Sequence, residues 1–186
     1  GAGQFVAASI GPIGEMLQPV GLLSKEQAEE LFAEQAGYLD KAGADLFIIE
    51  TMFDLNESQT AIRAVRSVSS LPVFATITFE KKSKGYFTIM GNTVQESMQG
   101  LAEAGASVVG ANCSIGSDQM IDLAREIKEN THLPVIVQPN AGMPEARKDQ
   151  VFYPEEKEFF ADNLLKIKNL GVEVVGGCCG TTPEYI

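Results

Sequence analysis

Short apolar runs rich in β-branched residues recur along the chain, and turn-forming residues bound each of them. Near-continuous apolar runs of this length are typical of strands that are buried on both faces of a parallel sheet. The predicted strands are Gln4–Ile10, Ala44–Thr51, Pro72–Phe79, Ser107–Cys113, Pro134–Asn140 and Val172–Cys178.

The segments between these runs place apolar residues at helical spacing. Ser24 and Gln27 form a capping-box pattern at the start of the first segment. Gly43, Gly105 and Gly171 stand just after three of the segments, where a left-handed helix cap favours glycine. The predicted helices are Ser24–Ala42, Leu55–Ser70, Thr93–Ala104, Asp118–Asn130 and Pro154–Asn169.

Strands that alternate with helices predict an α/β fold with a parallel sheet, which is either a doubly wound open sheet or part of a barrel. A dinucleotide-binding sheet should show G-x-G-x-x-G after its first strand, but the residues there, Ser9–Gly14, read SIGPIG and do not fit. Six units are too few to close an eight-stranded barrel. We therefore expect one domain over residues 1–186, a partial (β/α)8 TIM barrel that lacks its first two units.

The composition of the chain argues against two classes of partner, nucleic acids and membranes. The net charge of −11 argues against binding a nucleic-acid backbone, and 45% hydrophobic residues suit a globular domain. No apolar run approaches the length of a membrane span, and no signal peptide is recognisable, so we expect a cytoplasmic protein without a membrane partner. The chain begins without Met, which suggests a start after processing or within a longer protein.

Three cysteines, two of them adjacent, argue against a disulfide framework in this chain. Cys113 ends one predicted strand, and Cys178 and Cys179 end another, so all three should meet at the carboxyl edge of the sheet, where α/β folds build their sites. They are either small buried apolar residues or a metal or nucleophile site. Three thiolates suit a catalytic zinc ion with one open position. The single histidine, His132, precedes a strand at the opposite edge and is expected to be a surface residue.

Five stretches together resemble the homocysteine S-methyltransferase family, and they cover almost the whole chain. The most specific are the C-terminal stretch VGGCCGTTPEYI and the earlier GANCS. The five stretches are Ala8–Gly14, Phe47–Asn56, Gly110–Ser114, Gln138–Pro144 and Val175–Ile186. The family's first two strands, with an acidic residue that helps to hold homocysteine, have no counterpart here, and the chain stops two residues after Glu184.

The resemblance implies a (β/α)8 barrel in which Cys113, Cys178 and Cys179 bind Zn²⁺ and serve as the catalytic centre. It also implies that homocysteine is the substrate and methionine the product. The chemistry agrees with this ligand set, because a free thiol with a pKa of about 8.5 is mostly protonated at neutral pH, and binding to zinc removes its proton.

Three further residues are candidates for substrate binding. Glu50 ends the second predicted strand and is expected to hold the α-ammonium group of homocysteine; the alternative is an acidic residue near the start of the next helix. Asn112 is expected to orient a ligand or the substrate, or else to face the helices from its strand end. Asn140 either shapes the pocket or forms a turn.

The methyl donor is expected to come from elsewhere. The sequences ETMFDLN and GGCCGTTPE resemble the cobalamin-linked branch of the family most. The D-x-H-x-x-G pattern of a cobalamin-binding module is absent from the chain. Methylcobalamin and methyltetrahydrofolate would then be bound by other modules, in cis or in trans.

Other functions stay open at this point. Enzymes that use betaine or S-methylmethionine share the zinc motif. A structural zinc domain or a redox-responsive domain with a Cys178–Cys179 disulfide is the non-enzyme alternative. A cysteine-nucleophile hydrolase is disfavoured because no histidine base is suitably placed.

Overall fold

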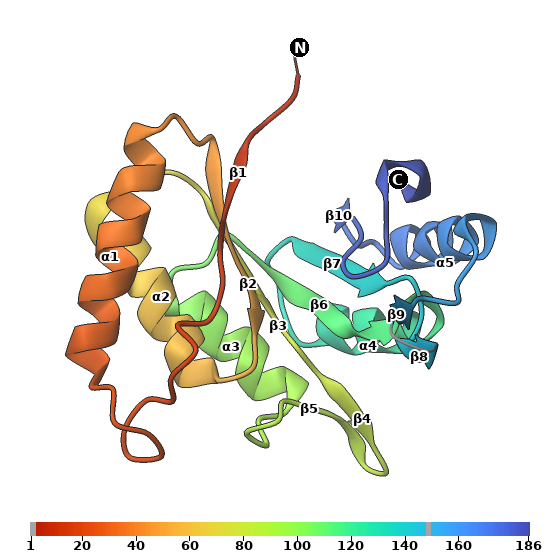
Figure 1. The fold of residues 1–186 in the computed structure, drawn as a ribbon, viewed down its shortest axis with the longest axis horizontal. Helices are drawn as coiled ribbons and strands as arrows, with labels where there is room; N and C mark the ends of the chain where they lie inside the picture. The colour runs from red at the N-terminus through yellow and green to blue at the C-terminus, as the bar shows by residue number, and fades with distance from the viewer. Residues whose placement is uncertain (1–2, 148–149) are drawn as a thin grey trace.

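A parallel sheet of six strands forms the centre of the molecule (Figure 1). In this computed structural model, residues 3–147 and 150–186 are described. The strand order in the sheet is β1-β2-β3-β6-β7-β10, so strands that follow one another along the chain are also neighbours in this sheet. They are β1 (Ala7–Ile10), β2 (Leu46–Met52), β3 (Val73–Ile77), β6 (Val108–Gly116), β7 (Val135–Asn140) and β10 (Val174–Val175). Each of the predicted strands is confirmed.

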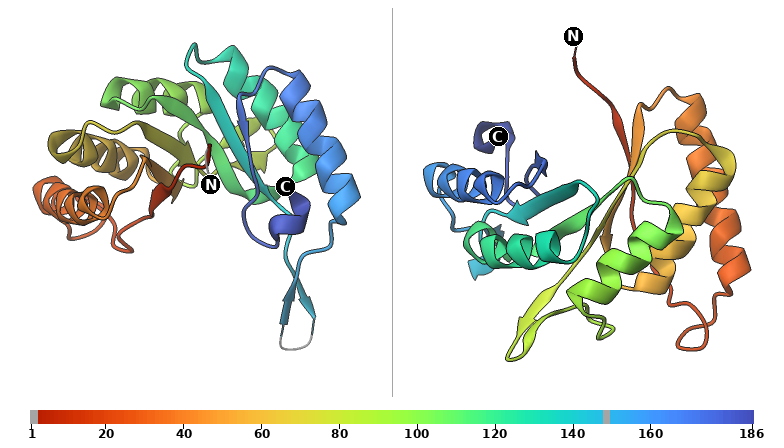
Figure 2. Two further views of the ribbon diagram at one scale, coloured as in Figure 1. Left: turned by 90° about the horizontal axis from the view of Figure 1, so that it is seen from above. Right: turned by 180° about the vertical axis from the view of Figure 1, so that it is seen from behind.

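Five helices connect these strands and lie in an arc along one face of the curved sheet (Figure 2, left). They are α1 (Lys25–Lys41), α2 (Leu55–Val68), α3 (Val94–Ala104), α4 (Ser117–Glu129) and α5 (Lys157–Asn169). The predicted α/β class is confirmed, and the arrangement is consistent with a partial (β/α)8 barrel whose open edges are β1 and β10. Within the described ranges, no helix is both long enough and apolar enough to cross a bilayer.

The predicted helix ends are formed by the expected residues. The Ser24 side chain accepts a hydrogen bond from the Gln27 backbone, and the Gln27 side chain accepts one from the Ser24 backbone, which completes the capping box. Gly43, Gly105 and Gly171 have φ of +91°, +106° and +86°, the left-handed conformation that ends a helix at low cost only for glycine.

Alternation along the strands gives the sheet two different faces. The face toward the helices carries side chains such as Ile49 and Val109 in one large hydrophobic core. The opposite face, which we call the inner wall, has a small apolar cluster. That cluster consists of Ile48, Phe74, Val108, Ile136 and Val174. Because a strand's side chains alternate, the polar residues Glu50 and Asn112 continue this inner wall toward the carboxyl edge.

Several predicted boundaries were wrong. β6 continues past Cys113 to Gly116, and β10 ends at Val175, so Cys178 and Cys179 lie in a loop instead of a strand. Thr182 does cap a helix, but that helix is a single 3-10 turn, η1 (Pro183–Tyr185).

Two antiparallel hairpins were not predicted. One joins β4 (Glu80–Lys82) to β5 (Gly85–Phe87), and the other joins β8 (Glu145–Arg147) to β9 (Gln150–Phe152). They follow β3 and β7, so both extend from the carboxyl edge of the sheet. All four strands are only three residues long, and β4 and β8 consist mostly of charged residues, which leaves little apolar alternation to detect.

Candidate metal centre

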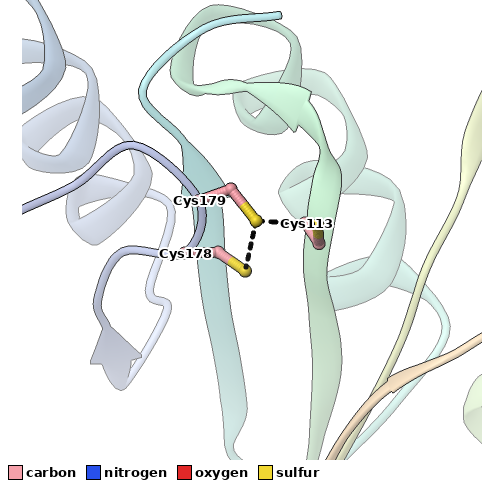
Figure 3. Close-up of side chains that lie close together, drawn as sticks. All are labelled: Cys113, Cys178 and Cys179. Atoms are coloured by element: carbon pink, nitrogen blue, oxygen red, sulfur yellow. Dashed lines mark hydrogen bonds between the residues drawn. The ribbon is translucent and has the colours of Figure 1, made fainter. Parts of the chain in front are cut away.

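The three cysteines converge at the carboxyl edge of the sheet. Cys113 comes from β6, Cys178 and Cys179 come from the loop after β10, and the side chains point toward one another (Figure 3). The Sγ atoms of Cys113 and Cys179 are 3.8 Å apart, and those of Cys178 and Cys179 are 4.0 Å apart. All three Sγ atoms lie within 4.8 Å of one another, and all three thiols are free.

The cysteine loop is held beside the end of β7. The Cys178 N–H donates to the Pro139 carbonyl (2.8 Å), and the Ala141 N–H donates to the Cys179 carbonyl (2.9 Å). The Cys179 N–H donates to Oδ1 of Asn140 (3.2 Å). These bonds extend the β7–β10 pairing beyond β10, so the loop that carries two sulfur atoms has a fixed position.

Glycine is required where this loop turns away. Gly180 has φ of +83°, and a Cβ atom added there would lie only 2.3 Å from Cγ of the Tyr153 ring. Both the backbone conformation and the close contact therefore exclude a side chain. Thr181 closes the turn by donating its N–H (3.2 Å) and its hydroxyl (2.7 Å) to the Cys178 carbonyl.

A bulge in β6 turns Cys113 toward the other two cysteines. Simple alternation would place Cys113 on the helix-facing side, because Asn112 lies on the inner wall. Cys113 and Ser114 instead have φ of +61° and +63°, and the pairing with β7 shifts between Asn112 and Gly116. Bulges of this kind redirect side chains, and left-handed backbone in non-glycine residues is concentrated at functional sites.

The thiols influence each other's protonation. A hydrogen bond from Cys178 lowers the pKa of Cys113 to about 5; burial opposes this shift, while the Ser114 N–H, Cys179 and Asn140 add to it. The pKa of Cys178 is raised by the same hydrogen bond, by burial and by the charge of its neighbours. Cys113 is thus readily a thiolate, and a cation placed among the three sulfur atoms would offset the repulsion that keeps Cys178 protonated.

The sulfur geometry fits a tetrahedral zinc ion. Zinc–thiolate bonds of about 2.3 Å at tetrahedral angles place neighbouring sulfur atoms about 3.8 Å apart, close to the two distances observed here. No ligand atom of a fourth His, Cys, Asp or Glu joins this group in the described part of the chain. Three protein ligands with an open position are typical of catalytic zinc sites, whereas structural sites usually have four.

Glu50 lies on the inner wall near the end of β2. It is half-buried, and its Oε1 accepts a hydrogen bond from the hydroxyl of Ser9 in β1 (2.6 Å). The N-cap of α2 is Asp54, whose side chain accepts the Asn56 N–H (2.8 Å). The alternative role for Glu50, an acidic residue serving the start of the helix, is therefore filled by Asp54.

The two asparagines support the cysteines directly. Asn112 is completely buried and contacts the Cys178 sulfur, so it does not face the helices. Asn140 is 4% exposed and accepts the Cys179 N–H. His132 is exposed in the loop before β7, at the opposite edge of the sheet, as expected.

Two polar residues at the site were missed from the sequence. The Tyr153 ring lies against Gly180 in the cysteine loop, and its pKa is raised by desolvation and by the neighbouring Cys179. Oε1 of Gln138 is buried and has no hydrogen-bond partner in the described residues. Gln138 alternates with Ile136 and Asn140 along β7, so its position on the inner wall was detectable, whereas nothing in the sequence located Tyr153.

Comparison with known proteins identifies the family. Residues 2–186 match the homocysteine S-methyltransferase family. The chain belongs to this family. It is 30% identical to the methionine synthase of Mycobacterium leprae and 31% identical to that of Mycobacterium tuberculosis, in each case over 98% of this chain. It spans only about 15% of the length of these curated relatives.

Solved structures show the same fold. The homocysteine methyltransferase MmuM from Escherichia coli, in its apo form, superposes with a TM-score of 0.75 at 24% identity, over 97% of this chain and 59% of that chain. The metallated form of that enzyme gives the same TM-score at 23% identity. This homocysteine S-methyltransferase family member therefore shares its fold with 59% of the length of that solved chain.

Proposed function

We propose that residues 1–186 form a homocysteine-binding domain that uses a zinc ion to transfer a methyl group to the homocysteine thiolate, giving methionine. The observation that carries this proposal is the cluster of three free thiols with tetrahedral sulfur spacing at the carboxyl edge of the sheet. Family membership supports the substrate, because the matched family is that of homocysteine S-methyltransferases.

Cys113, Cys178 and Cys179 are the residues that would hold the zinc ion. When bound, zinc lowers the pKa of a coordinating thiol and keeps it as a thiolate at neutral pH. The three cysteinates supply negative charge, so the substrate sulfur keeps its nucleophilic character. The thiol proton would be released to solvent when homocysteine binds, before the transfer. In the transfer itself, the bond from the methyl carbon to the donor breaks, with its electron pair left on the donor, as the thiolate forms the carbon–sulfur bond.

The inner wall would orient the amino-acid part of homocysteine. Glu50 is half-buried at the same carboxyl edge as the cysteines, and Ser9 fixes its side chain with a 2.6 Å hydrogen bond. A carboxylate held in this way would bind the α-ammonium group through a charged hydrogen bond. Asn140, which accepts the Cys179 N–H, is the other candidate for contact with the substrate at this edge.

We propose that the methyl donor is methylcobalamin, recharged from methyltetrahydrofolate by other modules in cis or in trans. The chain spans about 15% of the methionine synthases that it matches, which leaves most of their length for such modules. A betaine-dependent or S-methylmethionine-dependent reaction is the competing proposal.

The test is metal and substrate binding by the purified 186-residue chain. We expect about one zinc per chain by elemental analysis, three thiols by titration after metal removal, and release of one proton when homocysteine is added to the zinc-loaded chain. Zinc-loaded protein that binds homocysteine no better than the zinc-free chain would contradict the proposal. A Cys178–Cys179 disulfide in freshly purified protein would favour the redox-responsive alternative.

Donor identity requires a second experiment. Methionine formation is measured with methylcobalamin, betaine and S-methylmethionine as separate donors, each at the same homocysteine concentration. We expect methylcobalamin to give the fastest methionine formation. Faster turnover with either of the other donors would replace this part of the proposal and leave the zinc site intact.

A further inference from the structure

Asn112 makes an unusually complete set of hydrogen bonds behind the sulfur cluster. Its side chain is completely buried in the middle of β6, where the regular pairing with β7 ends. Oδ1 accepts the Thr51 N–H (2.8 Å) and the Thr76 hydroxyl (2.7 Å). Nδ2 donates to the Thr51 hydroxyl (2.9 Å) and to Sγ of Cys178 (3.7 Å). A primary amide has two donor and two acceptor positions, so this side chain has none left for a substrate.

The orientation of the amide is fixed by its partners. The Thr51 backbone N–H can only donate, so the atom of Asn112 that faces it must be the oxygen. The NH₂ group must then lie on the side of Cys178. The sulfur of Cys178 therefore receives an N–H from a residue 66 positions away in the sequence.

Thr51 is itself in an uncommon conformation. Its φ is +61°, in the left-handed region that β-branched residues rarely adopt. Asn112 binds both the N–H and the hydroxyl of this residue, and so holds the backbone in place. Thr51 directly follows Glu50, the residue to which we assign the substrate ammonium group. The amide of Asn112 thus connects β2, which carries Glu50, to the cluster of three sulfur atoms.

We propose that Asn112 is a positioning residue that donates an N–H to the Cys178 sulfur and fixes the distance between the metal centre and the Glu50 strand. This inference rests on the proposed zinc site. An N–H bond to a thiolate stabilises its negative charge and orients the ligand, and outer partners of this kind commonly change metal affinity about 10–100-fold when they are removed. Of the two roles that the sequence suggested for Asn112, orientation of a ligand and orientation of the substrate, the proposal selects the first.

The matched pair of variants is Asn112→Asp and Thr76→Val. Asn112→Asp keeps the shape and the oxygen that accepts from Thr51 and Thr76, but it removes both N–H donors. Thr76→Val removes a hydrogen bond from the other side of the same amide and leaves the N–H to sulfur intact. Each full-length chain is titrated with zinc against a chromophoric chelator, and its cobalt(II) form is examined by absorption spectroscopy.

We expect Asn112→Asp to weaken zinc binding about 10–100-fold and to move the sulfur-to-cobalt charge-transfer band to lower energy, because the sulfur becomes richer in electrons. Thr76→Val should lower thermal stability but leave the band and the zinc affinity unchanged. Equal band energies in the wild type and Asn112→Asp would overturn the inference while leaving the zinc site established. A wild-type chain that binds no metal would overturn both.

A second experiment uses the wild-type protein only, so its outcome does not depend on whether a variant folds. In ¹⁵N-labelled wild-type protein loaded with ¹¹³Cd, an N–H that donates to a cadmium-bound sulfur shows scalar coupling to the metal. The Ala141 backbone N–H, which donates to the Cys179 carbonyl oxygen and not to a sulfur atom, is the internal control. We expect coupling at the Asn112 side-chain amide and none at the Ala141 N–H. Absence of coupling at the Asn112 amide in cadmium-loaded protein would contradict the inference.

Discussion

The two faces of the parallel sheet are built differently, although the same strands supply both. The helix-facing side packs Ile49, Val109 and Val137 into a core that the five helices close. The inner wall has a cluster centred on three buried apolar residues, Ile48, Val108 and Ile136. Above this cluster, toward the carboxyl edge, the inner wall becomes polar.

Because of this difference, each strand carries residues for stability on one face and residues for chemistry on the other. The side chains of neighbouring residues such as Ile48 and Ile49, or Val108 and Val109, point to opposite faces and so contribute to different properties. Burial against helices is the main source of stabilising free energy, whereas the inner wall keeps the half-buried carboxylate of Glu50 accessible on the open side of the sheet. Variants on the two faces should therefore affect different measurements.

The largest effect is expected at the sulfur cluster. Cys113→Ala, Cys178→Ala and Cys179→Ala should each abolish tight zinc binding, because two thiolates leave the ion with too few ligands. Ser114→Ala, next to Cys113 but without a sulfur atom, is the control and should keep its zinc. The measurement is zinc content after gel filtration with a mild chelator. Stoichiometric zinc in all three cysteine variants would refute the ligand assignment.

The comparison of the faces is tested most directly by two adjacent isoleucines in β2. Ile49→Ala removes a side chain with 0% exposure from the helix-facing core and should lower the free energy of unfolding by roughly 2–5 kcal/mol. Ile48→Ala makes the same chemical change on the inner wall, where fewer neighbours surround the side chain, and should cost less. Urea denaturation measures both. Equal losses would show that the inner wall is as well packed as the core.

Glu50→Gln should affect ligand binding more than stability. It preserves size but removes the charge, so homocysteine binding should weaken by about 1.5–3 kcal/mol, the scale of a charged hydrogen bond, while zinc stays bound. A thiol without an amino group should bind the wild type and the variant equally. Titration calorimetry with both thiols gives the answer. Equal weakening for both would make Glu50 a structural residue.

The smallest effect concerns a carboxylate on the helix side. Glu57 is 2% exposed and accepts the Ile13 N–H (2.7 Å); desolvation raises its pKa above the ordinary value of 4.5, against the effect of that hydrogen bond. A raised pKa means that the folded state binds the proton more tightly than the unfolded state. Stability is therefore lost as pH rises from about 4.5 through the folded pKa.

Glu57→Gln keeps an oxygen for the Ile13 N–H and removes this loss. We expect the variant to gain thermal stability relative to the wild type as pH increases from 5 to 8. The measurement is the difference in melting temperature across that range. A difference that does not change with pH would show that Glu57 is solvated in solution.

Local sequence patterns determined the strands, the helices and the approximate position of the cysteines. A strand buried on both faces must be apolar throughout, and a helix on one face must repeat its apolar positions, so both patterns are visible in the sequence. The ends of parallel strands share one edge, so the strand pattern alone was enough to predict that Cys113 meets Cys178 and Cys179. Resemblance to the family supplied the proposed substrate, homocysteine, which spacing does not encode.

Only the tertiary structure decided how these residues act together. Simple alternation would place Cys113 on the helix-facing side of the sheet, away from the other cysteines. The left-handed backbone at Cys113 and Ser114, where the pairing with β7 shifts, turns its side chain toward them instead. Asn112 meets Thr51 and Cys178 across separations of 61 and 66 residues. Such contacts arise from packing between distant segments, whereas helix and strand patterns arise between neighbours. The sequence shows where the sulfur atoms gather, and the fold decides which polar groups support them.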